Sequence, residues 1–190
     1  VRGTDYRARY IGDAAYKKAG GVIIEDLFNE NQLWQDPDLL QQLFSTQLEL
    51  DAEELRSGFG YAWVETSAEL YVSAYGLEEQ LGYAQMAKTR VKLTTDQEKR
   101  YNDLVLLKET SQLDAVVQTE FDELQSQLKG LFTADQKQHS GLIVFVRNDG
   151  SVDAVQGLVR PADRAVAEEL GYLPKTEQKV AGEKSDYAQA

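Results

Sequence analysis

Residues 141–163 constrain the fold of this chain more than any other stretch. Leu142–Val146 is a run of aliphatic, β-branched and aromatic residues, which is typical of a strand buried on at least one face. Asn148-Asp149-Gly150 follows, and these residue types tolerate the positive φ angles of a tight turn. Val152–Val159 returns as a second strand, which Pro161 ends because it has no N–H to donate. The stretch therefore predicts a β-hairpin, and the residues of its second strand expected to share one face are Val152, Ala154 and Leu158.

The first part of the chain predicts short strands around a short helix. Tyr6–Ile11 alternates apolar and charged residues, as a half-exposed strand does. Asp13 is a suitable N-cap for a helix over Ala14–Lys18. Two further short strands are predicted at Val22–Ile24 and Gln32–Trp34 from their apolar content.

A longer helix has clear start and stop signals. Asp36 can cap it and Pro37 fits its first position, after which leucines recur near helical spacing as far as Arg56. Gly58 is expected to close the helix, and Tyr61–Thr66 follows as a strand. The next segment, Leu70–Leu93, has no clean periodicity and fits either short helices or an ordered loop.

These elements predict an α+β fold. We expect a mixed or antiparallel sheet of about five strands, with the helix that begins at Pro37 packed on one face. The strands assigned to this sheet lie near Tyr6, Val22, Tyr61, Leu142 and Val152.

A projecting αα-hairpin is predicted over Thr95–Phe132. Thr95 and Glu98 have the spacing of a capping box at its start, and a short polar break at Ser111-Gln112 separates its two helices. The second helix carries a heptad-like apolar stripe of Val117, Phe121, Leu124, Leu128 and Leu131. Such a short stripe is read first as an internal packing face, and self-association through Val117, Phe121, Leu124 and Leu128 is the alternative.

The predicted domain organisation is one α+β domain over residues 1–163, with residues 95–132 as a helical hairpin insertion. Residues 164–190 are expected to form a last helix over Arg164–Leu173 and then a polar linker or tail. Because the chain begins at Val1 rather than methionine, we expect it to be a piece of a longer protein.

Charge and composition limit the kinds of partner. The 190-residue chain has a net charge of −12, which argues against general binding of nucleic acid or anionic membrane. Hydrophobic residues make up 42%, enough for a packed core, but no apolar run is long enough to span a membrane. The absence of cysteine excludes disulfides and thiolate metal sites and is compatible with the cytoplasm, the expected location.

Positive charge is concentrated near the start of the chain. The residues that could contact nucleic-acid or nucleotide phosphates are Arg7, Arg9, Lys17 and Lys18. A solvated strand face explains them first, and a phosphate-contacting patch is the alternative. We expect the chain to bind duplex DNA weakly or not at all.

No sequence pattern indicates a catalytic or cofactor site. His139 is the single histidine, and without cysteine or a second histidine the usual zinc sites cannot be assembled. The nucleophile elbow and the glycine loops that bind phosphates are missing. The paired carboxylates lie in charge-rich segments where a solvated face is the default: Glu53-Glu54, Glu78-Glu79 and Glu168-Glu169. We therefore expect no enzyme activity, cofactor or metal. A hydrolase built on carboxylates is a further alternative, which a phosphoester screen with and without Mg²⁺ would test.

Three stretches resemble ParB-like partition proteins of large plasmids and mobile elements. The first is Tyr10–Gly21 with Glu25–Phe28 and Asp36–Leu40, and the second is Gly60-Tyr61-Ala62-Trp63-Val64. The third is the Asn148-Asp149-Gly150 turn followed by Gly157–Asp163. The resemblance spans most of residues 6–163, and it depends on the order and spacing of the three stretches.

The resemblance implies a role through a parent protein. In this family an amino-terminal domain binds nucleotide and partners, and a helix-turn-helix domain after it reads DNA. The matching stretch lies beyond the helix-turn-helix domain, so no functional residue of the family can be placed on this chain. The implied function is an accessory or assembly domain of a bacterial DNA-binding protein in plasmid or chromosome partition. Its expected partners are a second copy or other partition proteins, with DNA bound by other domains and no membrane contact.

Overall fold

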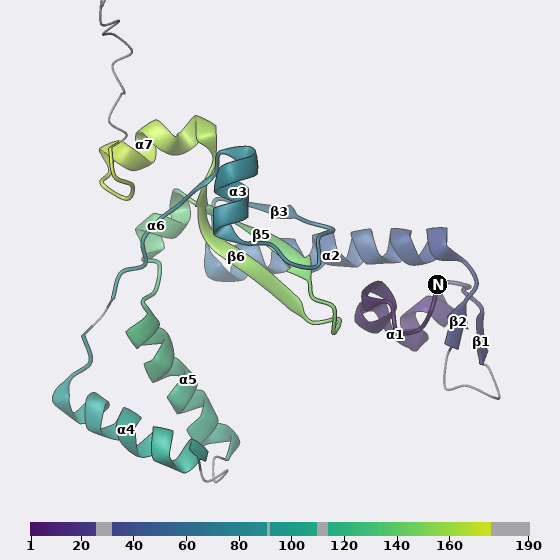
Figure 1. The fold of residues 1–190 in the computed structure, drawn as a ribbon, viewed down its shortest axis with the longest axis horizontal. Coiled ribbons are helices and arrows are strands. Elements are labelled where there is room, and N and C mark those ends of the chain that lie inside the picture. The colour runs from purple at the N-terminus through teal and green to yellow at the C-terminus, as the bar shows by residue number, and fades with distance from the viewer. Residues whose placement is uncertain (26–31, 91, 110–113, 176–190) are drawn as a thin grey trace, which may run out of the picture.

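The hairpin of residues 141–159 forms the centre of a four-stranded sheet. The computed structural model describes residues 1–25, 32–90, 92–109 and 114–175, and in it β5 (Gly141–Val146) pairs antiparallel with β6 (Val152–Val159). The sheet order is β3-β5-β6-β4, with β3 (Trp63–Thr66) parallel to β5 and β4 (Ala84–Gln85) antiparallel to β6. The α+β class is confirmed, and the sheet mixes parallel and antiparallel pairs (Figure 1).

Strand β5 is buried on both faces, which explains its continuous apolar sequence. Leu142, Val144 and Val146 face α2 (Pro37–Phe59) and pack with the buried residues Phe44, Leu48, Ala52 and Tyr61. Ile143 faces the other way and packs with Tyr83 and Leu158. The second face also receives Leu77 from α3 (Ala74–Leu81).

A β-bulge at Gly157 changes which side of the sheet β6 presents. Leu142 pairs with Gln156 but Gly141 pairs with Leu158, so the register slips by one residue at Gly157, whose φ is 72°. Ala154 packs on the α2 side, whereas Leu158 packs on the α3 side. The expectation that Val152, Ala154 and Leu158 share one face is therefore wrong, because one extra residue reverses the side-chain alternation.

Helix α2 begins as predicted and ends slightly later. The Asp36 side chain accepts a hydrogen bond from the Leu39 N–H at 2.9 Å, and Pro37 opens the helix. The helix continues through Gly58 to Phe59, and Gly60 ends it with a left-handed φ of 78°. The glycine that closes the helix is therefore Gly60.

Tyr6–Ile11 is helical, so the predicted strand there is wrong. It belongs to α1 (Tyr6–Lys18), which Asp5 caps by accepting a hydrogen bond from the Arg7 N–H at 2.9 Å. Gly12, with φ 75° and ψ 153°, interrupts the helix, so the predicted helix after Asp13 is its second half. Tyr6 and Tyr10 lie one turn apart and both contact the Phe44 ring edge-on, at 5.5 and 5.6 Å between centroids. This packing selects the helix for a short sequence whose pattern also fits a strand.

The strands near Val22 and Gln32 form, but outside the main sheet. β1 (Ile23–Glu25) pairs antiparallel with β2 (Gln32–Trp34) in a separate two-stranded sheet next to α1. The main sheet therefore takes neither a strand at Tyr6 nor one at Val22. It takes β4 from the segment that the sequence left open, and α3 lies in the same segment.

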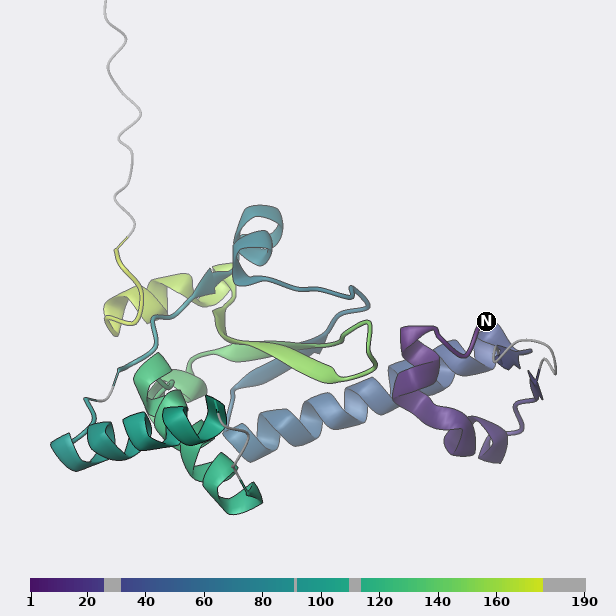
Figure 2. The ribbon, with the colours of Figure 1, turned by 60° about the horizontal axis from the view of Figure 1, so that its bottom comes forward.

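The αα-hairpin is formed by α4 (Thr95–Glu109) and α5 (Ala115–Lys129), which extend away from the sheet (Figures 1 and 2). Its capping box lies one residue earlier than predicted: the Thr94 hydroxyl accepts from the Gln97 N–H at 3.3 Å, and the Gln97 side chain accepts from the Thr94 N–H at 3.0 Å.

The hairpin's core contains Leu93, Leu104, Phe121 and Leu124. The Tyr101 and Phe121 rings stack at 5.5 Å, and Arg100 pairs with Glu120 at 2.7 Å.

Short helices complete the chain around one end of the sheet. α6 (Ala134–Gln138) has a capping box between Thr133 and Gln136, and the 3-10 turn Pro161–Asp163 leads into α7 (Arg164–Glu169). A cluster of buried residues joins this end: Ala84, Met86, Phe132, Val159, Ala167 and Leu173. The predicted helix after Asp163 forms but ends at Glu169, not at Leu173. Residues 176–190 of the predicted tail lie outside the described residues.

Candidate interaction surfaces

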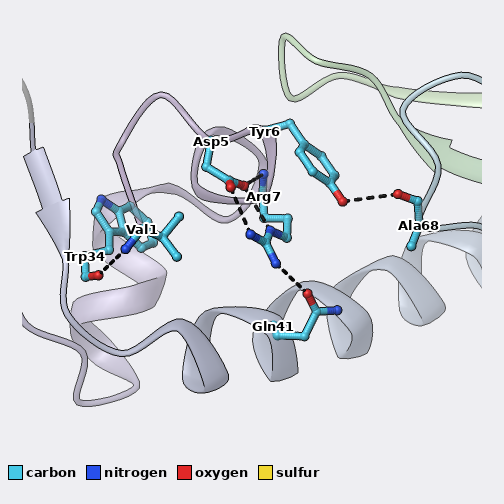
Figure 3. A network of polar contacts seen from close by, with 7 residues as sticks. All are labelled: Val1, Asp5, Tyr6, Arg7, Trp34, Gln41 and Ala68. Carbon is cyan, nitrogen blue, oxygen red and sulfur yellow. Dashed lines mark hydrogen bonds and ion pairs between the residues drawn. The ribbon is translucent and has the colours of Figure 1, made fainter.

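Arg7 is engaged in a structural network at the start of α1 (Figure 3). Its guanidinium lies 2.9 Å from the Asp5 carboxylate and donates a hydrogen bond to the Gln41 side chain on α2 at 2.8 Å. The hydrogen bond from Arg7 holds the pKa of Asp5 below its ordinary value, although partial burial opposes the shift. Beside it, the Tyr6 hydroxyl donates to the Ala68 carbonyl, so this network ties α1 to α2 and to the chain after β3.

Arg9 fixes the tip of the β5–β6 hairpin against α1. Its guanidinium donates to the Asn148 carbonyl at 2.9 Å, within the predicted turn. Gly150 lies so close to α1 that an added Cβ would be 2.7 Å from the Cβ of Arg9. Lys17 and Lys18 lie in the last turn of α1, exposed and without an ion pair to any described residue. Of the four candidate phosphate contacts, Arg7 and Arg9 thus have structural partners, and the two lysines remain exposed.

A polar cluster that the sequence did not reveal lies on the α3 side of the sheet. Glu65 on β3 accepts hydrogen bonds from Arg160 at 2.6 Å and from the Tyr83 hydroxyl at 2.9 Å, one at each carboxylate oxygen. The Arg160 guanidinium lies 4.2 Å from the centre of the Trp63 ring. Burial raises the pKa of Tyr83, and the hydrogen bond to Glu65 adds to the shift. The hydrogen bonds of Glu65 therefore join β3 to the start of β4 and the end of β6.

The histidine and two of the paired glutamates named in the sequence analysis lie at the surface or in ion pairs on their own helices. His139 is exposed, with its ring 6.1 Å from that of Tyr172. Glu53 pairs with Arg56 at 2.5 Å, and Glu168 pairs with Arg164 at 3.1 Å. Among the described residues no three acidic or histidine side chains gather closely enough to hold a metal ion, and no helix there could span a membrane.

Exposed apolar side chains lie on α3 and just before it. Tyr71 is 79% and Tyr75 73% exposed, and the same short stretch exposes Leu70 and Leu81. Two grooves, of about 400 and 410 Å³, meet at Tyr71–Ser73, and the second extends over β6 to Lys88. We call Leu70, Tyr71, Tyr75 and Leu81 the α3 surface. The sequence showed two tyrosines four residues apart in an unassigned segment. The exposure of Tyr75 follows from α3 turning Leu77 to the sheet, and Tyr71 lies in the irregular stretch before that helix.

A third groove lies between α2 and the start of β6. It has a volume of about 540 Å³ and combines the apolar side chains Leu55, Phe59 and Val152 with the carboxylates Asp51 and Glu54. Asp51 already accepts hydrogen bonds from the Tyr10 hydroxyl at 2.6 Å and from Gln47 at 2.7 Å.

The predicted self-association stripe is divided in the structure. Val117, Phe121 and Leu124 pack against α4, whereas Leu128 is 40% exposed and Leu131 is exposed beyond the end of α5. The first three positions therefore serve internal packing within the hairpin.

Comparisons with known proteins found no matching family model, no matching curated protein and no matching solved structure.

Proposed function

We propose that this chain is a non-catalytic assembly domain that binds other proteins, within a ParB-like DNA-binding protein of plasmid or chromosome partition. The observation that carries the proposal is the α3 surface. Exposed aromatic and aliphatic side chains on α3 and on the stretch just before it, beside grooves, are characteristic of protein-binding surfaces, where Tyr is enriched among residues that dominate affinity.

The charged groups favour the same interpretation. Arg7, Arg9, Glu65 and Arg160 hold secondary-structure elements together, so they support a scaffold. The link to partition proteins is supported by the order of the three resembling stretches along the chain.

Substitution of the two exposed tyrosines tests the proposal. Tyr71→Ser with Tyr75→Ser should weaken binding to the purified partition proteins of the same plasmid at least tenfold, because it removes the two exposed aromatic rings of the α3 surface. The thermal midpoint should change little, since both side chains are exposed. Val116→Ser, which removes an exposed apolar side chain on α5, is the matched control. Binding that is unchanged in the double variant contradicts the proposal.

A phosphate-contacting module is the second candidate, favoured by exposed Lys17 and Lys18. Charge reversal of Arg7 and Arg9 would disturb the contacts to Asp5, Gln41 and Asn148, so Lys17→Glu with Lys18→Glu is the cleaner test. Under the first proposal the chain shifts duplex DNA weakly or not at all. Tight, salt-dependent binding that this double variant abolishes would establish the second candidate instead.

A further inference from the structure

The outer face of α5 forms a groove that is not used within the chain's own core. It has a volume of about 390 Å³ and is lined by Thr119, Asp122, Glu123, Ser126, Gln127 and Leu131. All of these residues except Leu131 lie on α5, and they recur three and four residues apart, so they share one face of that helix. Phe121 and Leu124 lie on the opposite face and pack against α4.

This face is acidic toward one end and basic at the other. Asp122 and Glu123 are exposed carboxylates, and Lys129 lies two turns after Asp122. Thr89 pairs with Leu131 through hydrogen bonds of 2.9 and 3.0 Å, which brings a second basic segment to the end of α5.

Two further cations converge at this end of the helix. A Cβ added at Gly130 would lie 2.9 Å from the Cβ of Lys88 and 3.4 Å from the Cγ of Arg90. Lys88, Arg90 and Lys129 are exposed, and none has an ion pair with a described residue. No carboxylate occurs in the sequence between Glu79 and Asp96 or between Glu123 and Asp135, so the two segments that carry these cations hold no acidic residue of their own.

We propose that two copies of this chain associate through this face, with their α5 helices antiparallel and the two-fold axis near Ser126. Residues seven apart lie on the same side of a helix, and Ser126 is close to the midpoint of Asp122 and Lys129. The antiparallel arrangement therefore places Lys129 opposite Asp122 of the second copy, and Lys88 and Arg90 opposite its Glu123. A parallel arrangement would oppose like charges.

The small Ser126 side chain at the centre permits close approach of the helices. The inference rests on the proposed assembly role and names a second copy as one partner.

The contact is short, so the association should be weak and sensitive to salt. Asp122 to Lys129 spans about 12 Å of helix, which favours an interface at the small end of specific contacts. Exposed ion pairs are screened as ionic strength rises, and the dimer should dissociate accordingly.

Charge exchange tests the pairing, with mass measured by sedimentation over a concentration series at low salt. Asp122→Lys alone and Lys129→Glu alone should each weaken dimerisation at least tenfold, and the double exchange should restore it. Asp103→Lys on α4 makes the same change of net charge away from this face and should weaken it much less. Circular dichroism confirms that each variant is folded.

A single thiol tests the position of the axis, because the chain has no cysteine. Helices packed 8–10 Å apart bring facing Cα atoms within disulfide range. Ser126→Cys should therefore form a disulfide-linked dimer under mild oxidation. The control is Ser57→Cys, also exposed and helical, on α2, and it should link far less.

A chain that stays monomeric, or a dimer that ignores the charge exchange and does not link through Ser126→Cys, overturns this inference. Neither result bears on protein binding by the α3 surface, which is tested separately with Tyr71→Ser and Tyr75→Ser. Binding that Tyr71→Ser with Tyr75→Ser leaves unchanged contradicts the proposed function separately.

Discussion

Gly157 is required for two reasons: the bulge needs a positive φ, and the Phe132 ring leaves no room for a side chain. An added Cβ would lie 2.2 Å from the Phe132 ring, and φ is 72°. Gly157→Ala should lower the free energy of unfolding by about 2–3 kcal/mol, because it adds overpacking to backbone strain. Urea unfolding followed by circular dichroism measures this. Gly58→Ala, in α2 with open space around its Cβ position, should instead stabilise by about 0.5 kcal/mol.

Tyr61 should make stability depend on pH above neutrality. Burial raises its pKa from 10.0 to about 12. The folded protein then keeps the phenol proton where the unfolded chain loses it. The corresponding stability is intact below pH 10 and is lost as pH rises toward 12, by roughly 2–3 kcal/mol.

Urea unfolding between pH 9 and 12 checks this against Tyr61→Phe, which should not show that part of the loss. Tyr75→Phe on the exposed α3 surface should leave the loss in place, and equal pH dependence in all three proteins would contradict the assignment.

At the scale of elements, the α4–α5 hairpin has a core of its own. Its buried residues Leu93, Leu104, Phe121 and Leu124 are distinct from those that pack around β5. Phe121→Ala should cost about 3–4 kcal/mol locally, because Phe121 is buried and stacked on Tyr101. Hydrogen exchange should then lose protection over α4 and α5 while β5 amides stay protected. Loss of protection in β5 to the same extent would show instead that the hairpin and sheet unfold together.

The elements that the sequence predicted well are those whose local signals agree with their packing. Helix α2 has Asp36 and Pro37 at its start, and β5 is apolar at every position because both its faces are buried. Tyr6–Ile11 was mispredicted because six residues fit two periods, and the decision between them comes from contact with Phe44. Gly157 was a visible glycine within a strand, a known sign of a bulge, but its effect on Leu158 depends on the partner strand's register.

The candidate surfaces were harder to predict than the fold. The stripe on α5 was correctly identified as apolar, but the partner that buries Phe121 and Leu124 is fixed by how α4 folds back. The grouping of Lys88 and Arg90 with Lys129 depends on the Thr89–Leu131 pairing, and no periodicity within either segment indicates it. Exposure around α3 similarly depends on tertiary packing.

At the scale of the whole molecule, α2 runs through two neighbouring cores, which meet at Ile11. Leu40 packs with Ala8, Tyr16 and Trp34 near the start of the chain, and Phe44 and the residues after it pack beneath β5. Figure 2 shows α2 continuing from beneath the sheet to the region of α1, β1 and β2. One continuous helix, about 35 Å long at 1.5 Å per residue, therefore belongs to both cores. Arg9 and Gly150 add a contact between α1 and the hairpin turn.

This arrangement predicts that both cores unfold in one cooperative transition, and the two tryptophans can report it. Trp34 is buried in the first core, and Trp63 lies on β3 beside Arg160. The Trp34→Phe variant keeps only Trp63, so its fluorescence reports the sheet. The Trp63→Phe variant keeps only Trp34, so its fluorescence reports the first core. For each variant the fluorescence midpoint in urea should coincide with its own circular dichroism midpoint, because α2 cannot lose one core's support without exposing the other's apolar residues. Leu40→Ala, combined with Trp34→Phe, should lower the Trp63 midpoint by an amount equivalent to about 2–4 kcal/mol, although Leu40 and Trp63 belong to different cores. A Trp63 midpoint that Leu40→Ala leaves unmoved would mean that α2 joins two independently stable units.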